Sequence, residues 1–146
     1  MSFVLHELVS VSIYSVLGII LMLLGSFLVD LVIPCSFPEE IKKGNTAIGW
    51  ISAGVYVAIG IIIRAAITSP SSSIREIEAT LVGGLLSTVY YYALGAIFLM
   101  IGYVILKLIN RKYDLNTEVG NGNAAAGIMV FGMFVGLGFV ISGVIA

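Results

Sequence analysis

The sequence predicts an all-α membrane protein in which four transmembrane helices form two parallel two-helix repeats with pseudo-two-fold symmetry. Hydrophobic residues make up 60% of the 146 residues and charged residues only 10%, whereas an ordinary soluble domain carries roughly 25% charged residues. Apolar stretches of about 20 residues are long enough to cross the hydrocarbon core as helices, and four occur here. The second pair of stretches also repeats the residue pattern of the first pair.

The same composition excludes several classes of protein. A chain of 15.5 kDa with a mean hydropathy of +1.14 has too little interior to hide its apolar surface from water, which excludes a soluble or disordered chain. The net charge of −1 provides no field that selects a polyanion, so no nucleic-acid partner is expected. The expected partner is the lipid bilayer, and residues 1–146 are expected to form a single transmembrane domain.

The apolar stretches are expected to be helices because backbone groups in lipid must hydrogen-bond within their own segment. They lack the alternation of polar and apolar residues that marks the strands of a membrane barrel. The four spans cover residues 9–33, 47–68, 79–109 and 124–145, and the two repeats cover about 9–68 and about 79–146. Short polar connections at 34–46, 69–77 and 110–123 join the spans.

The distribution of cationic residues predicts the orientation. Five of them fall on the side of the connections 34–46 and 110–123, and two fall on the side of the chain ends. The five are Lys42, Lys43, Lys107, Arg111 and Lys112, and the two are Arg64 and Arg75. The positive-inside rule therefore places both connections in the cytoplasm and both termini outside, in a multi-pass protein of the cell (inner) membrane.

The internal repeat is clearest at the start of the second and fourth spans. Residues 40–49 read Glu-Ile-Lys-Lys-Gly-Asn-Thr-Ala-Ile-Gly, and residues 118–127 read Glu-Val-Gly-Asn-Gly-Asn-Ala-Ala-Ala-Gly, an offset of 78. The first and third spans align at an offset of 77. Two spans in each repeat return the chain to its starting side, so the copies are parallel, with an axis along the membrane normal. The expected core is a four-helix bundle.

Small residues form a stripe on one face of the second span and again on the fourth. Membrane helices associate through such close backbone approach, although glycine is also simply common in membrane helices. The helix-packing residues expected on this basis are Ala47, Gly54, Ala58 and Ala65, with their equivalents Ala125, Gly132, Gly136 and Gly143. Because Gly49, Gly60, Gly127 and Gly138 lie on roughly the opposite face, neighbours are expected on both faces, which predicts a homo-oligomer, with a dimer favoured.

The doubled motif is similar to a known family. The pattern Glu-[Ile/Val]-x-x-Gly-Asn-x-Ala-x-Gly opens an apolar span in each half, and an Asp-x-x-x-Pro turn, Asp30 to Pro34, precedes the first copy. Over nearly the whole chain, this sequence resembles the domain-of-unknown-function family 350, also described as uncharacterised protein family 719. The resemblance implies a small prokaryotic inner-membrane protein with four spans in two repeats, and it implies a role of the membrane-stress type but no defined activity.

Two asparagines are the sharpest candidate site residues. Asn45 and Asn123 each follow a glycine, Gly44 or Gly122, and immediately precede a span. An asparagine there is expected to cap the helix N-terminus, with Glu40 and Glu118 near the positive end of each helix dipole. The alternatives are an anion site built from the two helix N-termini and polar packing of the asparagines against the first or third span.

Six further residues carry polar groups in or near the spans. Asp30 and Lys107 occupy equivalent positions in the two repeats, which predicts either an ion pair between the repeats or two side chains that reach interfacial water. Arg64 is expected to snorkel to the headgroups or to pair with Glu76 or Glu78. The consecutive residues Tyr90, Tyr91 and Tyr92 point in three directions, and at least one hydroxyl is expected to face the bundle; with Arg64 they are the candidates for a pore or polar lining.

No catalytic or metal-ligating set is visible in the sequence. The single His6 and the single Cys35 provide no metal-ligand spacing and no internal disulfide, so no enzyme activity, metal or cofactor is expected. The function that the sequence favours is a non-enzymatic structural or interaction component of the cell envelope, which presents 34–46 and 110–123 to a cytoplasmic protein. The alternative is an oligomeric channel or transporter for a small solute or ion.

Overall fold

The computed structural model describes residues 2–69 and 81–146, and within those ranges every regular element is a helix. The long helices are α1 (Ser2–Val32), α3 (Thr46–Thr68), α5 (Leu81–Ile109) and α7 (Ala124–Ile145). All four are long and apolar enough to cross a membrane, which confirms the predicted all-α membrane fold. Most of the connection expected at 69–77, together with Arg75, Glu76 and Glu78, lies outside the described residues.

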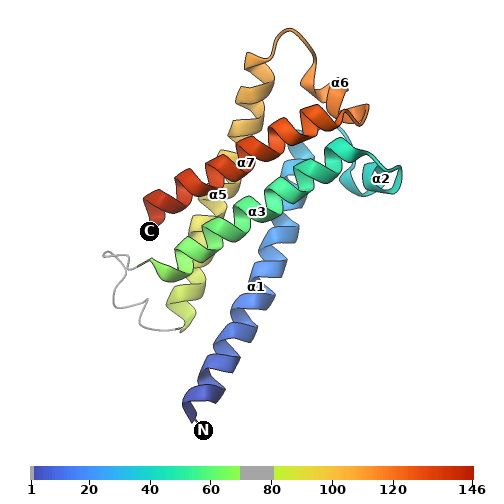
Figure 1. The fold of residues 1–146 in the computed structure, drawn as a ribbon. Helices are drawn as coiled ribbons and strands as arrows, with labels where there is room; N and C mark the ends of the chain where they lie inside the picture. The colour runs from blue at the N-terminus through green and yellow to red at the C-terminus, as the bar shows by residue number, and fades with distance from the viewer. Residues whose placement is uncertain (1, 70–80) are drawn as a thin grey trace.

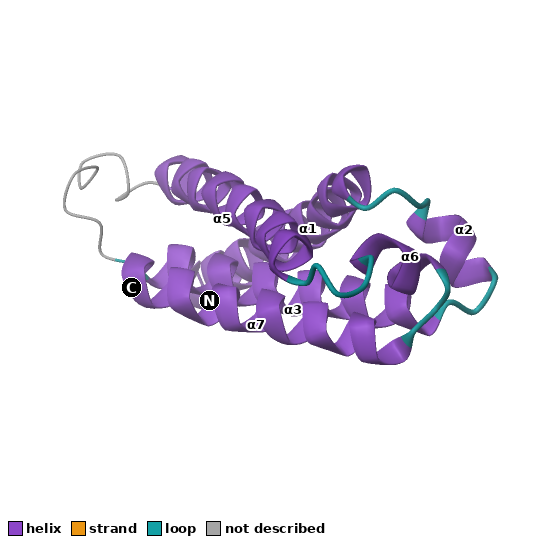
Figure 2. Ribbon diagram, turned by 90° about the horizontal axis from the view of Figure 1, so that it is seen from above, coloured by secondary structure: helices purple, strands orange, loops and turns teal. Residues whose placement is uncertain are grey.

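The helices lie in two layers. Figure 2 shows α3 and α7 side by side in one layer, with α1 and α5 in the other. Figure 1 shows that the two short helices, α2 (Phe37–Lys42) and α6 (Leu115–Gly120), sit together at one end of the molecule, away from both chain ends. The connections 34–46 and 110–123 therefore meet, and the two copies of the repeated motif lie next to one another.

The helices α2 and α6 were not expected from the sequence, although each begins with a recognisable signal. Ser36 is the N-cap of α2, and a proline follows in its first turn with Glu39 and Glu40. Asp114 is the N-cap of α6, and its side chain accepts a hydrogen bond from the backbone N–H of Asn116. Proline and acidic residues in a first turn, after a serine or aspartate, are typical helix-start signals.

The main contact between the repeats joins α3 to α7 through small residues. On α3 the residues Ala47, Gly54 and Ala58 are buried in this contact. A Cβ atom added to Gly127 of α7 would lie 2.6 Å from the Cα and the carbonyl oxygen of Ala47. The glycines of the contact therefore allow the two backbones to approach one another closely, as small residues do in membrane helices.

The predicted small-residue stripe is buried on α3 but does not pack within the chain on α7. Ala65 is buried like the rest of the α3 stripe. The equivalent residues of α7 are exposed, and they are Ala125, Gly132, Gly136 and Gly143. Helix α7 instead buries the opposite face, whose buried residues are Ala126, Gly127, Val130, Phe134 and Gly138.

This contact also departs from the expected two-fold relation between the repeats. A two-fold axis would require that, if Ala47 meets Gly127, then Ala125 meets Gly49. A Cβ added to Gly49 meets nothing within 4 Å, and Ala125 is exposed. The two repeats therefore meet through different faces of their equivalent helices.

Packing inside each pair of helices, by contrast, follows the sequence repeat. Gly25 of α1 lies against the side chain of Ile59 on α3, and Gly102 of α5 lies against the side chain of Leu137 on α7. The offsets are 77 for the glycines and 78 for the aliphatic residues, as in the sequence alignment. Each two-helix unit is thus closed by an equivalent contact, whereas the join between the units is asymmetric.

Candidate functional site

The turns that lead into α3 and α7 have the same local geometry. Gly44 and Gly122 both have φ of 78°, in the left-handed region that glycine enters without strain. The next residue in each turn is the helix N-cap, Asn45 or Asn123, in an extended conformation. Each asparagine accepts a hydrogen bond from the first turn of its helix: Asn45 Oδ1 accepts from Ile48 N at 3.1 Å, and Asn123 Oδ1 from Ala125 N at 3.0 Å. Both asparagines are therefore helix N-caps, as predicted.

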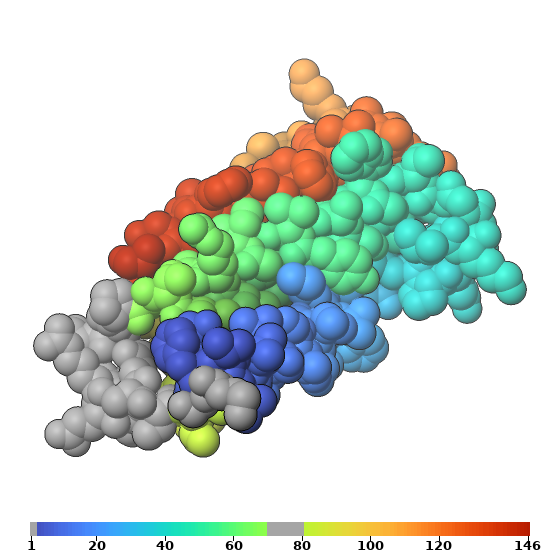
Figure 3. Space-filling view, turned by 60° about the horizontal axis from the view of Figure 1, so that its bottom comes forward, coloured from blue at the N-terminus to red at the C-terminus, as the bar shows by residue number. Residues whose placement is uncertain are grey.

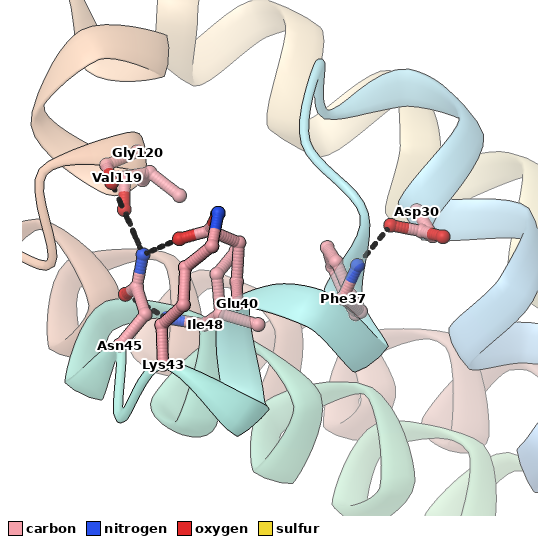
Figure 4. Close-up of polar contacts among 8 residues, drawn as sticks. All are labelled: Asp30, Phe37, Glu40, Lys43, Asn45, Ile48, Val119 and Gly120. Atoms are coloured by element: carbon pink, nitrogen blue, oxygen red, sulfur yellow. Dashed lines mark hydrogen bonds and ion pairs between the residues drawn. The ribbon is translucent and has the colours of Figure 1, made fainter.

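Asn45 also joins the two repeats. Its side-chain amide nitrogen donates to Glu40 Oε2 at 2.8 Å and, across the chain, to the carbonyl oxygens of Val119 at 3.0 Å and Gly120 at 3.3 Å (Figure 4). Asn45 is only 9% exposed. The hydroxyl of the next residue, Thr46, donates to the carbonyl oxygen of Gly122 at 2.8 Å. These hydrogen bonds tie the start of α3 to the end of α6 and the turn that follows it.

Asn123 makes only the local half of this arrangement. Its side-chain amide donates to Glu118 Oε2 at 2.6 Å, which matches the bond from Asn45 to Glu40. No hydrogen bond of Asn123 within residues 2–69 and 81–146 crosses to the first repeat, and its side chain is exposed. Sequence reasoning could not distinguish the two asparagines, because the difference depends on the asymmetric join between the repeats.

A carboxylate occupies each helix start, which argues against an anion site there. Glu40 accepts from Asn45 and from Lys43, whose Nζ lies 2.8 Å from Glu40 Oε1. The hydrogen bonds from Lys43 and Asn45 hold the pKa of Glu40 below its ordinary value, and the same Glu40 contact raises the pKa of Lys43. The negative charge that a helix N-terminus favours is thus already provided by the chain itself, through Glu40 and Glu118.

The lowered pKa of Glu40 predicts that acid weakens this junction. A carboxylate whose pKa is lower in the folded state stabilises the fold above its unfolded pKa, and that stabilisation is lost as the pH falls through the folded pKa. We expect Glu40→Gln to remove part of the acid sensitivity of thermal unfolding in detergent. The matched variant Glu118→Gln, at the copy whose asparagine bonds only locally, is expected to change it less. Equal acid sensitivity of Glu40→Gln and the unchanged protein would contradict this role.

The predicted ion pair between Asp30 and Lys107 is not formed. Asp30 Oδ1 instead accepts the backbone N–H of Phe37 at 2.8 Å (Figure 4), and the one ion pair among the described residues joins Lys43 to Glu40. Lys107 lies in the last turn of α5. The hydrogen bond from Thr117 lowers the pKa of Asp114 most, and the charge of Lys107 lowers it to a smaller extent. Asp30 thus anchors the first residue of α2, because the short turn after α1 brings the Phe37 N–H within its reach.

Asp30 also lines a cavity of about 300 Å³. The cavity lies between the end of α1, α2 and α3, and its polar lining comes from Asp30, Ser26, Ser52 and Tyr56. Leu23, Phe27, Phe37, Pro38 and Ile41 form the apolar part of the lining. The sequence did not indicate this cavity, because α2 had been expected to be part of a polar connection.

The remaining predicted polar residues do not form a common lining within one chain. Tyr90 is 60% exposed, and its ring packs edge-on against Tyr91 at 5.4 Å. Tyr92 is buried, and its hydroxyl has no hydrogen-bond partner among the described residues. Arg64 is exposed near the end of α3. The tyrosines point in different directions, as expected for consecutive residues of a helix.

Two contacts that sequence reasoning missed hold α6 in place. The Tyr103 hydroxyl of α5 lies 2.7 Å from Asn116 Oδ1, and the Thr117 hydroxyl donates to Asp114 Oδ2 at 2.7 Å. The signal for the second contact, an N-cap aspartate followed three residues later by threonine, stands in the sequence.

The described residues contain no cluster of three or more His, Cys, Asp or Glu side chains that could hold a metal ion. The arrangement is a hydrogen-bonded joint between helix ends.

Comparisons with known proteins agree with this fold. A family model described as Domain of Unknown Function (DUF350) matches residues 2–145. The UPF0719 transmembrane protein of Aquifex aeolicus (strain VF5) is 26% identical over 140 residues, which cover 95% of this chain and 50% of that protein. The UPF0719 transmembrane protein YshE of Bacillus subtilis (strain 168) is 26% identical over 137 residues, which cover 94% of this chain and 93% of that protein.

This chain therefore spans half the length of the Aquifex relative and nearly all of the Bacillus relative. No solved structure matches it. The family match covers the four membrane-spanning helices and both copies of the asparagine motif. The chain belongs to the DUF350 family of multi-pass membrane proteins.

Proposed function

We propose that this protein is a non-enzymatic structural or interaction component of the cell (inner) membrane. The observation that carries the proposal is the close packing of α3 on α7, in which Gly54, Gly127 and Gly138 have no room for a Cβ without displacing backbone. Ionisable side chains of the described spans, such as Asp30, Arg64 and Lys107, stand near helix ends. Proton relays use ionisable groups inside the membrane, and this close packing of helices supports a scaffold instead.

The orientation proposed with this function places α2 and α6 in the cytoplasm and both termini outside. Lys42, Lys43, Lys107, Arg111 and Lys112 belong to the end of the molecule that carries α2 and α6, and the positive-inside rule favours the cytoplasm for that end. The partner would be a cytoplasmic protein that contacts connections 34–46 and 110–123. Photo-crosslinking residues placed at Lys42 and Lys112 are expected to yield the same protein adduct, and the control position Val144 is expected to yield none.

Solute flux across liposomes separates this proposal from the alternative of an oligomeric channel or transporter. The purified protein would be reconstituted in its assembled form and tested with small ions, water and polyamines, next to Asp30→Asn and Tyr91→Phe. The scaffold proposal predicts no flux above that of empty liposomes. Flux that either substitution alters would overturn it and establish a transport pathway.

A further inference from the structure

We propose that copies of this chain assemble head to tail, with α7 of one copy packed on α3 of the next in the way that α3 packs on α7 within one copy. The inference goes beyond the proposed function, because it concerns contact between copies and does not depend on a cytoplasmic partner.

The proposal rests on two kinds of helix surface. The stripe face is Ala47, Gly54 and Ala58 on α3, or Ala125, Gly132 and Gly136 on α7. The counter face is Gly127, Phe131 and Gly138 on α7, or Gly49, Ala53 and Gly60 on α3.

Within the chain, each contact joins a stripe face to a counter face. Added Cβ atoms on Gly127 and Gly138 would lie 2.6 Å and 2.9 Å from the Cα atoms of Ala47 and Ala58. An added Cβ on Gly54 would lie 2.9 Å from the Cα of Phe131. The stripe face of α3 is thus seated on the counter face of α7, which leaves the stripe face of α7 and the counter face of α3 outside this contact.

The leftover surfaces are open in the single chain. Cβ atoms added to Gly132 and Gly136 of α7 meet nothing within 4 Å, and the same is true of Gly49 on α3. Gly60 meets only the end of the Met22 side chain at 3.3 Å. Figure 3 shows that a face of α3 lies uncovered between α7 and α1. The stripe face of α7 is therefore free to take the counter face of α3 in a second copy.

A second site appears where the outer helices would join, at Gly18, which is buried but has room for a Cβ. Helix α5 meets α3 at Gly95, whose added Cβ would lie 2.6 Å from the Ile62 side chain. The equivalent positions are Gly18 on α1 and Val140 on α7. Nothing lies within 4 Å of a Cβ added to Gly18, and Val140 is 65% exposed. Val140 of one copy would fill the space at Gly18 of the next.

The polar joint provides a third, independent match. Asn45 donates to the carbonyl oxygens of Val119 and Gly120 in the second repeat. The equivalent donor is Asn123, which is exposed, and the equivalent acceptors are the carbonyl oxygens of Ile41 and Lys42. Val119, which this joint covers, is 0% exposed, whereas Ile41 is 50% exposed. Asn123 of one copy therefore has matching acceptors on the α2 end of another.

Such a contact between unlike faces either closes into a ring or continues as a filament. All copies must keep their spans across the same bilayer, so the rotation from copy to copy is about the membrane normal. In a ring, contacts within a chain would alternate with equivalent contacts between chains, and two copies are the smallest such ring. This geometry differs from a two-fold dimer in which the α7 stripe faces pack on each other.

The test uses cysteine cross-linking between differently tagged chains that carry Cys35→Ser. The positions are Lys42→Cys in one chain and Ala124→Cys in the other, because their equivalents Gly120 and Thr46 line the same small pocket within one chain. A short thiol cross-linker is expected to give a product with both tags when the two chains are expressed together in membranes, and no dimer from either chain alone. Cross-linking of Gly132→Cys to itself would overturn the proposal in favour of a dimer in which two α7 stripe faces pack on each other. The absence of a product in any arrangement would also overturn it, because lipid would then cover these faces.

A second set of variants separates assembly from folding. Gly18→Leu and Gly136→Leu add bulk where the single chain has open space, so both are expected to abolish the mixed product and to leave thermal unfolding of the dispersed chain unchanged. Val144→Leu adds bulk on the same helix at an 83% exposed side chain and is expected to leave the product intact. Full cross-linking of both glycine variants would overturn the proposal.

Discussion

Asn45→Ala is expected to lower the free energy of unfolding by about 3 kcal/mol, the sum of a lost helix cap and of the lost hydrogen bonds to the carbonyl oxygens of Val119 and Gly120. Asn45 is 9% exposed and donates to three oxygen atoms, two of them in the other repeat. Its loss therefore opens the joint between α3 and α6 as well as the start of α3. Asn123→Ala is the matched variant, because it removes the same cap from α7 with no contact to the other repeat.

The measurement for both variants is equilibrium unfolding in a detergent that keeps the chain dispersed. Trp50 is the only tryptophan of the chain, and its ring packs edge-on against Phe131 of α7 at 5.4 Å. Its fluorescence therefore reports separation of α3 from α7. The Asn123→Ala change is expected to cost about 1 kcal/mol, the ordinary value of a helix cap. Equal losses in the two variants would contradict the asymmetric joint.

Gly127→Ala is expected to destabilise the chain by about 3 kcal/mol, because even a methyl group would overlap the backbone of Ala47. An added Cβ there lies 2.6 Å from both the Cα and the carbonyl oxygen of that residue, and rigid backbone does not yield as a side chain does. Overpacking of this kind forces shifts that cost about 1–3 kcal/mol and occasionally more. The two central helices would have to move apart along their contact.

Gly132→Ala is the matched control on the same helix. A Cβ there meets nothing within 4 Å, and alanine is about 1 kcal/mol better than glycine in a helix interior. The dispersed chain should therefore be unchanged or slightly more stable, whereas Gly127→Ala destabilises it. Destabilisation by Gly132→Ala as large as that by Gly127→Ala would mean that α7 packs through its other face.

Much of the fold could be predicted because the bilayer constrains it. Long apolar segments must be helices in lipid, and the expected spans 47–68 and 124–145 agree with α3 and α7 to within a residue. The first span starts earlier than the expected residue 9, because helix α1 runs from Ser2 through the polar pair His6 and Glu7. The asparagine caps were predicted because their signal is local, a glycine and then an asparagine ahead of an apolar run.

The join between the repeats could not be predicted, for a physical reason. Small residues lie on both faces of the second and fourth spans, so periodicity offers either face for packing. Which face is used depends on contacts between residues about 80 positions apart, such as Ala47 with Gly127. The Asp30–Lys107 pair was predicted wrongly because the Asp30 carboxylate accepts the backbone N–H of Phe37 instead. That contact depends on the conformation of the turn after α1.

The central claim is that α3 and α7 of the same chain form the core of this protein in the membrane. Cross-linking of Trp50→Cys to Phe131→Cys, in a chain carrying Cys35→Ser, tests it most directly, since those two rings lie 5.4 Å apart. The structure predicts a product that keeps the mobility of a single chain, with the two positions joined in its peptides. A product found only between two chains, each carrying one of the cysteines, would contradict the claim.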